Sequence, residues 1–327
     1  MRSSLFNTAA TVALVLCIPA AIATAAPSDD AANPADSQAL DIQGEYTGMV
    51  KSPDAEFKVG MQVIALGDGA FRAVVYPGGL PGDGWDGINK LDADGTLADG
   101  VVTFAGDNAR GELKDNVLRV FDADDNQMAA LERVDRKSPT LGEAPPDGAV
   151  VLFDGTSADA FDGGKLSDDG LLIAGATSKQ KFQDCHLHVE FRLPFMPQAR
   201  GQARGNSGCY LQGRYEVQML DSFGLEGLDN ECGGIYSIKR PDTNMCFPPM
   251  AWQTYDIDFT AAKYEDGKKV TDATMTVKHN GVEIHKDVKL PKATTAAPVP
   301  EGPEPGPIYL QDHGNPVRYR NVWVVEK

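Results

Sequence analysis

The sequence predicts an all-β protein in which a small all-β domain precedes a two-sheet β-sandwich of the jelly-roll type. Short apolar runs alternate with polar residues at a period of two, which is typical of strands with one buried face. Gly (34) and Pro (21) are plentiful among 327 residues, and tight-turn signals such as Asn280-Gly281 separate the runs. No long amphipathic helical pattern accompanies them, so a layered α/β fold is disfavoured.

Residues 1–26 are typical of a secretory signal peptide. Arg2 is the only charged residue before Asp29, and an alanine-rich apolar stretch ends in small residues that suit cleavage. The stretch is short for a membrane span, so we expect export to the periplasm or the medium and no membrane insertion. Residues 27–39 are predicted to be a polar linker.

Residues 40–136 are predicted to form the small β-rich domain, whose function the sequence does not indicate. The runs 57–66 and 70–76 are strand-like, with a Gly-Asp-Gly turn between them. The Gly- and Pro-rich loop that follows carries Trp85, which either anchors the loop on the core, the interpretation we favour, or stacks on a sugar. Residues 137–148 form a second, Pro-containing linker.

Residues 149–327 are predicted to form the sandwich. Residues 186–193 alternate between polar and apolar side chains, as expected for a half-buried strand. Asn280-Gly281 separates the strand-like runs 274–279 and 282–285, which predicts a two-residue hairpin.

The formal net charge of −17 limits the partners. Nucleic acids and anionic lipids bind to cationic surfaces, so neither is expected as a ligand. Neutral sugars remain possible as ligands or substrates. No cofactor is predicted, although acidic loops could hold a hard cation such as calcium.

Four cysteines remain beyond the signal segment. An even number in an exported chain suggests disulfides. Cys232 and Cys246 flank one loop-like segment and are the predicted pair. The alternative is free thiols in the core, which is more plausible for Cys185 and Cys209 because both lie in strand-like runs.

The densest polar segment runs from residue 205 to residue 221. If one strand continues through Gly213, alternation places on one face Tyr210, Gln212, Arg214, Glu216 and Gln218. A turn at Gly213 would alter this and would leave Glu216 and Gln218 as the surest pair on one face. Such a face suits a polyol, because amides and Arg hydrogen-bond hydroxyls and Tyr packs on a sugar ring. A solvated outer face explains the pattern about equally well.

Two further clusters could complete a site. His313 lies beside Gln311 and Asp312 in a turn, and an imidazole can transfer protons near neutral pH. The Pro-rich segment from Cys232 to Trp252 could form a rigid wall. Serine-hydrolase, nucleotide-binding and zinc-protease signatures do not occur.

Five stretches, in order, resemble the 3-keto-disaccharide hydrolase family over residues 149–327. They are Val151-Leu152-Phe153-Asp154-Gly155, His188-Val189-Glu190-Phe191-Arg192, residues 205–221, Trp252-Gln253-Thr254-Tyr255-Asp256, and residues 311–318. The resemblance implies a concanavalin-A-like sandwich and chemistry on glycosides that a separate oxidoreductase has oxidised at C3. In the chemistry that the resemblance implies, a base would remove the C2 proton, the C1 substituent would leave and water would add, so that a family member acts as a lyase, a hydratase or a net hydrolase.

Residue type and position suggest a role for individual residues in this chemistry. Glu216 would be the base, His313 the acid or enolate stabiliser, and Asp221 a second carboxylate or a metal ligand. The substrate would be held by Asn206, Tyr210, Gln212, Arg214, Gln218, Gln311 and Arg318. Two alternatives remain open at this point: a non-catalytic lectin-like sugar-binding module, and a conventional glycosidase that pairs Glu216 with Asp221.

Overall fold

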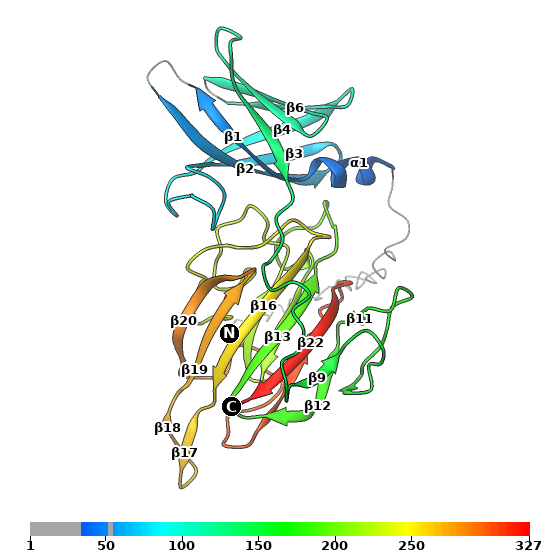
Figure 1. Ribbon diagram of the computed structural model, residues 1–327, viewed down its shortest axis with the longest axis vertical. Helices are drawn as coiled ribbons and strands as arrows, with labels where there is room; N and C mark the ends of the chain where they lie inside the picture. The colour runs from blue at the N-terminus through cyan, green and yellow to red at the C-terminus, as the bar shows by residue number, and fades with distance from the viewer. Residues whose placement is uncertain (1–33, 52–54, 107) are drawn as a thin grey trace, which may run out of the picture.

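A computed structural model describes residues 34–51, 55–106 and 108–327, and it is nearly all β (Figure 1). The predicted all-β fold is confirmed. The predicted signal peptide lies outside the described residues. The end of the predicted linker belongs to a short helix, α1 (Pro34–Ile42). No helix in the described part of the chain is long and apolar enough to cross a membrane.

The first eight strands close into a barrel, and each strand pairs antiparallel with the next. The last strand returns to the first, with Thr47 opposite Glu132. Alternate side chains such as Phe71 and Leu131 point inward and fill the barrel. The strands are β1 (Gly44–Lys51), β2 (Glu56–Gly67), β3 (Ala70–Pro77), β4 (Leu91–Ala98), β5 (Val101–Ala105), β6 (Ala109–Lys114), β7 (Val117–Asp122) and β8 (Gln127–Val134).

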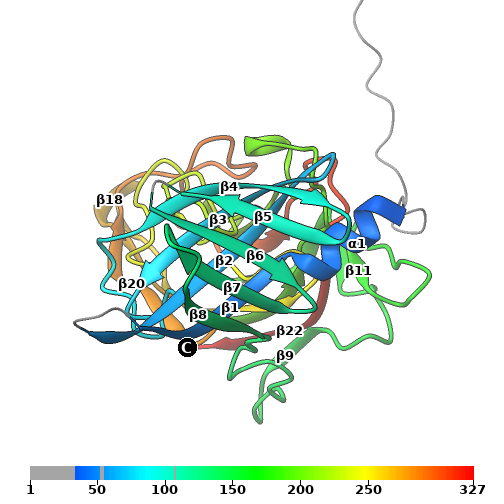
Figure 2. The same ribbon diagram turned by 90° about the horizontal axis from the view of Figure 1, so that it is seen from above.

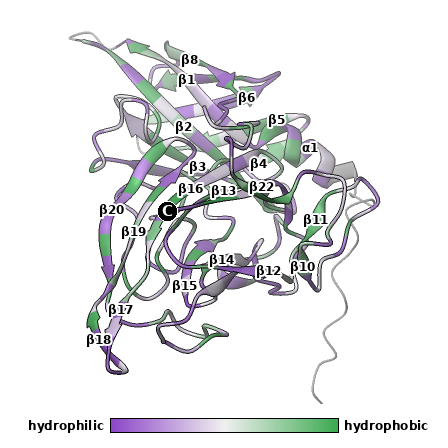
Figure 3. Cartoon of the chain, turned by 60° about the horizontal axis from the view of Figure 1, so that its bottom comes forward, coloured by the Kyte–Doolittle hydropathy of each residue, from purple (hydrophilic) through white to green (hydrophobic). Residues whose placement is uncertain are grey.

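All but two of the remaining strands form the sandwich, whose two sheets are separate layers in Figure 3. A five-stranded sheet has the order β10 (Phe161–Asp162), β12 (Ala176–Phe182), β21 (Gly306–Leu310), β14 (Ser207–Leu211), β15 (Tyr215–Met219). A seven-stranded sheet has the order β11 (Leu172–Ile173), β22 (Arg318–Glu326), β13 (Cys185–Arg192), β16 (Trp252–Thr260), β19 (Ala273–His279), β20 (Val282–Leu290), and β9 (Val150–Phe153) pairs with β22. A separate hairpin comprises β17 (Lys263–Glu265) and β18 (Lys268–Thr271).

Two turns decide the strand register. Asn280 and Gly281 have φ of +50° and +79° and join β19 to β20, so the predicted hairpin is confirmed. The chain also turns at Gln212 and Gly213, with φ of +55° and +62°. The 205–221 segment is therefore a hairpin rather than one continuous strand, with Leu211 opposite Tyr215.

The outer face of β13 is covered, although the sequence predicted it to be half-exposed. Residues 138–143 lie over it, and the backbone N–H of Gly142 donates to the carboxylate of Glu190. Arg320 Nε lies 2.6 Å from Glu190 Oε2, and His188 Nδ1 lies 2.6 Å from Asp256 Oδ1. Burial opposes ionisation of Glu190, but the hydrogen bonds to it lower its pKa to about 2. The second linker is thereby fixed to the sheet.

The barrel packs on one end of the sandwich (Figures 1 and 2). Phe223, from a sandwich loop, shares an apolar cluster with Ile64, Val74 and Leu80 of the barrel. Arg72 of β3 donates to the carbonyl of Gly224 at 2.9 Å. The loops at this end of the sandwich are therefore held against a folded surface.

We predict that Glu190→Ala lowers the free energy of unfolding by about 1–3 kcal/mol near neutral pH, because it removes the buried carboxylate that accepts hydrogen bonds from the Gly142 N–H and from Arg320. Chemical denaturation followed by circular dichroism measures this change. Glu132→Ala, at an exposed position on the barrel, is the control and should change stability by less than about 0.5 kcal/mol. Equal effects of the two substitutions would contradict a stabilising role for the Glu190 network.

Candidate active site

A pocket lies on the face of the five-stranded sheet that points away from the sandwich core. On β15 the side chains of Tyr215, Val217 and Met219 enter the core, and those of Glu216 and Gln218 point the other way into the pocket. Six of the predicted site residues line it: Asn206, Tyr210, Glu216, Gln218, Gln311 and His313.

Glu216 lies inside this pocket with only 3% of its surface exposed. Tyr210 stands opposite it on β14 and hydrogen-bonds to it. Burial raises the pKa of the Glu216 carboxyl to about 7, and the contact with Tyr210 opposes this rise only in part. A carboxyl group with this pKa exchanges protons close to neutral pH.

The Glu216 side chain lies across Gly208, its neighbour on β14. A Cβ atom at residue 208 would come within 2.2 Å of Glu216 Oε1, closer than non-bonded atoms approach. The carboxylate can occupy this position only because residue 208 has no side chain. Gly208 therefore sets where the acid lies.

A cluster of amides forms one side of the pocket. Gln218 Nε2 donates to Gln202 Oε1 at 3.1 Å, and Asn206 Nδ2 donates to the Gln202 carbonyl at 2.8 Å. Gln311 Nε2 donates to Tyr210 Oη at 3.2 Å. The opposite ends of two amides, Asn206 Oδ1 and Gln311 Oε1, are buried and have no partner among the described residues. Such acceptors are costly to leave unpaired, and donors such as ligand hydroxyls would satisfy them.

His313 lies at the opening of the pocket and is exposed. It follows β21, and the next residue, Gly314, donates its N–H to Asp312 Oδ1 at 2.8 Å, which closes the turn. The arrangement is therefore asymmetric, with a buried carboxyl group inside and an imidazole at the entrance.

Four lining residues were not predicted as site residues: Gln202, Tyr236, Thr295 and Ala296. Tyr236 belongs to the segment predicted as a wall, and its N–H donates to the Glu216 carbonyl at 3.2 Å. The segment holding Thr295 is docked by Thr294, whose Oγ1 accepts from the N–H of Glu216. Its Ala-, Thr- and Pro-rich composition is typical of a linker and carries no signal for a binding site.

Asp221, predicted as a second carboxylate or a metal ligand, does not line this pocket. Its Oδ2 lies 2.5 Å from Arg204 Nε, and its Oδ1 accepts from the N–H of Phe223. Arg204 in turn donates to the carbonyl of Ala65 on the barrel. Asp221 therefore belongs to the junction of the two domains and does not line the pocket.

Three predicted substrate-binding residues also lie elsewhere. Gln212 and Arg214 flank the turn at Gly213, where Arg214 donates to the carbonyls of Pro300 and Glu304. Gln212 Nε2 donates to the carbonyl of Phe182. Arg318 lies on β22 of the other sheet. The reversal of the chain at Gly213 removes all but Tyr210, Glu216 and Gln218 from the face that was predicted for one strand.

The predicted Cys232–Cys246 disulfide is not present, and both residues are buried free thiols. The two are neighbours, as their positions in the sequence suggested. Each thiol has other partners: Cys232 Sγ lies 3.3 Å from Tyr255 Oη, and Cys246 Sγ donates to the Phe247 carbonyl. Packing and hydrogen bonds hold this wall.

Glu143, His188 and Asp256 could offer three metal ligand atoms within 4.8 Å of one another. Although burial opposes protonation of His188, its hydrogen bonds to Asp256 and Glu190 raise its pKa to about 9. An imidazolium has no lone pair for a metal, so the cluster fits an ion-pair network better than a metal site. It lies on the seven-stranded sheet, away from the pocket of Glu216.

Comparison with known proteins identifies a protein family whose sequence model matches this chain. The model of a family described as a 3-keto-alpha-glucoside-1,2-lyase-like domain matches residues 148–325. A "putative glycosyl hydrolase" of known structure from Parabacteroides distasonis ATCC 8503 is 33% identical, with a TM-score of 0.52 over 56% of this chain and 85% of its own. Two more structures with that description and source are 18% identical, with TM-scores of 0.41 and 0.39, over 55% of this chain and 94% and 100% of theirs. No protein with a curated description matches.

We predict that Glu216→Gln makes the protein more stable above neutral pH. The unfolded chain releases this proton near pH 4.5 and the folded protein only near pH 7, so the stability contributed by the protonated acid is lost as pH rises between these values. At ~1.4 kcal/mol per pKa unit, the variant should gain about 3 kcal/mol over wild type between about pH 4 and pH 8. Denaturation curves across this range measure the difference.

The exposed Glu132→Gln serves as the matched control and should show no such pH dependence. A Glu216→Gln advantage that stays constant with pH would contradict a buried, titrating carboxyl group.

Proposed function

Because the chain belongs to the 3-keto-alpha-glucoside-1,2-lyase-like family through residues 148–325, we propose that it cleaves glycosides whose sugar carries a ketone at C3. In coarser terms the protein is a carbohydrate-active hydrolase. The main support for 3-keto-glycoside cleavage is one observation. Glu216 is a buried carboxyl group with a pKa of about 7, and the amides around it have unpaired acceptors. This arrangement suits a base that works on a neutral, hydroxyl-rich molecule.

The first step is removal of a proton from carbon. The ketone at C3 acidifies the C2–H bond, and the Glu216 carboxylate takes this proton while the electron pair moves into a C2–C3 double bond. The C3 oxygen then becomes an enolate. The hydroxyl of Tyr210 and the amide of Gln311, which are joined by a hydrogen bond, are the nearby donors that could stabilise it.

The second step expels the C1 substituent. The enolate collapses to restore the C3 ketone, a C1–C2 double bond forms, and the bond from C1 to the leaving oxygen breaks. His313, at the pocket entrance, is placed to give a proton to the departing alcohol. Water then adds at C1 and a proton returns to C2, so the sum is hydrolysis to a 3-keto sugar and an alcohol.

A conventional glycosidase mechanism fits the site less well. It needs two carboxyl groups on opposite sides of the scissile bond. Among the described residues that line the pocket, Glu216 is the single carboxyl group, because Asp221 is paired with Arg204. One buried base in a pocket that also has an exposed imidazole in its lining suits elimination better.

The proposal includes the setting of the enzyme. The N-terminal 26 residues predict export, and the substrate would come from a separate oxidoreductase that oxidises glycosides at C3. The site needs only side chains for the steps above, and we propose no cofactor.

We predict that the purified protein releases p-nitrophenol from p-nitrophenyl 3-keto-glucoside but not from p-nitrophenyl glucoside. In D2O the sugar product should carry deuterium at C2, and kcat/KM should rise through about pH 7 as Glu216 ionises. Mass spectrometry and absorbance measure these outcomes, and a reaction without protein corrects for spontaneous exchange.

Glu216→Gln should abolish the reaction while the protein stays folded. Equal turnover of the unoxidised glucoside, or full activity of Glu216→Gln, would overturn the proposed chemistry. Binding of sugars without any turnover would indicate that the protein is a lectin-like sugar-binding module.

We predict that Gly208→Ala lowers kcat/KM on the 3-keto substrate on the order of 100-fold, because a carboxylate displaced by about 1 Å no longer meets the C2 proton. Gly111→Ala, whose added methyl would sit 3.5 Å from its nearest neighbour in the barrel, is the control and should retain activity. A fully active Gly208→Ala variant would show that this position of Glu216 is not the reactive one.

A further inference from the structure

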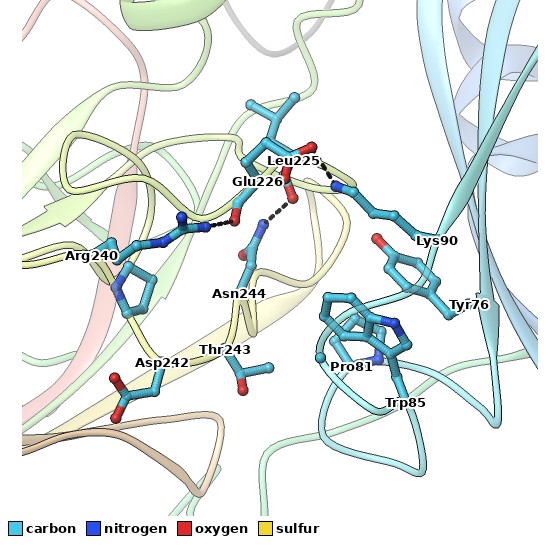
Figure 4. Close-up of a pocket in the computed structure, with 12 residues that line it drawn as sticks. Tyr76, Pro81, Trp85, Lys90, Leu225, Glu226, Arg240, Asp242, Thr243 and Asn244 are labelled. Atoms are coloured by element: carbon cyan, nitrogen blue, oxygen red, sulfur yellow. Dashed lines mark hydrogen bonds and ion pairs between the residues drawn. The ribbon is translucent and has the colours of Figure 1, made fainter.

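A second hollow lies between the barrel and the sandwich, apart from the pocket of Glu216. Its cavity volume is about 340 Å³, which is in the range of small-molecule sites. Figure 4 shows Tyr76 and Trp85 of the barrel on one side and Thr243 and Asn244 of a sandwich loop on the other. No step of the proposed reaction uses this hollow.

The barrel side presents an immobilised aromatic ring. Trp85 Nε1 donates to the carbonyl of Asn89 at 2.7 Å, and Tyr76 meets the indole in a T-shaped contact with centroids 5.0 Å apart. The loop between them folds back on itself: Gly79 has a φ of +141°, and a Cβ atom there would lie 2.0 Å from the carbonyl oxygen of Asp83. A ring that is fixed before binding loses little entropy when a ligand stacks on it.

The charged groups around the hollow already have partners. Lys90 Nζ lies 2.5 Å from Glu226 Oε1, and Asp242 pairs with Lys239 at 2.9 Å. Arg240 donates to the backbone carbonyl of Glu226 at 2.8 Å. The charged side chains that line the hollow are two cations and two anions, so the lining does not favour a cation, and the net charge of −17 of the whole chain disfavours an anion.

The groups that remain suit hydroxyls. The carboxylates of Glu226 and Asp242 keep free lone pairs beside their ion pairs, and the Thr243 hydroxyl can both donate and accept. An aromatic platform facing such groups is the usual chemistry for a neutral sugar ring, whose CH face stacks while its hydroxyls bond outward.

From these observations we propose that the hollow between the barrel and the sandwich is a second binding site, which takes a neutral saccharide ring stacked on Trp85. The site does not depend on the reaction at Glu216, and its ligand needs no ketone. The segment from residue 236 to residue 244 contributes Tyr236 to the first pocket and Thr243 and Asn244 to the second. A saccharide chain held at Trp85 would therefore be retained next to the loop that borders the reactive pocket.

The test is isothermal titration of the full-length protein with unoxidised cellotetraose, maltotetraose, xylotetraose and mannotetraose. At least one should bind, and Trp85→Ala and Thr243→Val should each weaken that binding, Trp85→Ala by about tenfold or more. Ile88→Ala is the matched control: this side chain lies on the same loop, is 79% exposed and does not line the hollow. It should bind as wild type does.

Glu216→Gln separates this proposal from the proposed reaction, because it should abolish turnover and leave tetrasaccharide binding intact. Thermal denaturation of each variant verifies folding. If Trp85→Ala does not fold, the saccharide affinity of Thr243→Val tests the proposed site instead. The proposal is overturned if none of the four saccharides binds, if Thr243→Val and a folded Trp85→Ala bind as wild type does, or if binding is lost in Glu216→Gln.

Discussion

The site depends on one constraint, the two-residue alternation of β15. Tyr215, Val217 and Met219 are buried in the sandwich core, so the strand cannot rotate or slide without exposing them. Glu216 must then point to the opposite face, where loops cover it and keep water away. The raised pKa of Glu216 is therefore a consequence of core packing on the other side of the same strand.

The amide side chains that line the pocket are also held in place by the surrounding structure. Gln218 and Asn206 both donate to Gln202 Oε1, and Gln202 Nε2 donates to the carbonyl of Asn230. These amide N–H groups are therefore engaged with other acceptors, and Asn206 Oδ1 has no partner among the described residues. An unpaired buried acceptor lowers the stability of the free protein, and a ligand donor that reaches it recovers this free energy on binding. The pocket is thus organised before any ligand arrives, which limits the entropy that binding must overcome.

Alternation in the sequence was sufficient to predict the all-β fold and to put Glu216 and Gln218 on one face, because both lie on the same strand. Tyr210 shares that face because the hairpin pairs it with Glu216, which alternation along one continuous strand does not establish. It failed at Gly213, where two residues with positive φ reverse the chain. It also failed for Asp221 and Arg214, whose partners come from distant parts of the chain: Arg204 beside the barrel and the carbonyl of Pro300. Local pattern cannot show whether a polar side chain will meet a substrate or a distant backbone group.

These distant partners also tie the barrel to the pocket. Gln202 and Asn206, two of the pocket amides, flank Arg204 in the sequence. Arg204 is fixed at both ends of its guanidinium, by Asp221 of the sandwich and by the carbonyl of Ala65 in β2. The position of the amides therefore depends on how the barrel docks, because a shift of β2 would move Arg204 and the backbone on either side of it. The barrel, whose role the sequence left open, is by this argument part of the framework that positions the site.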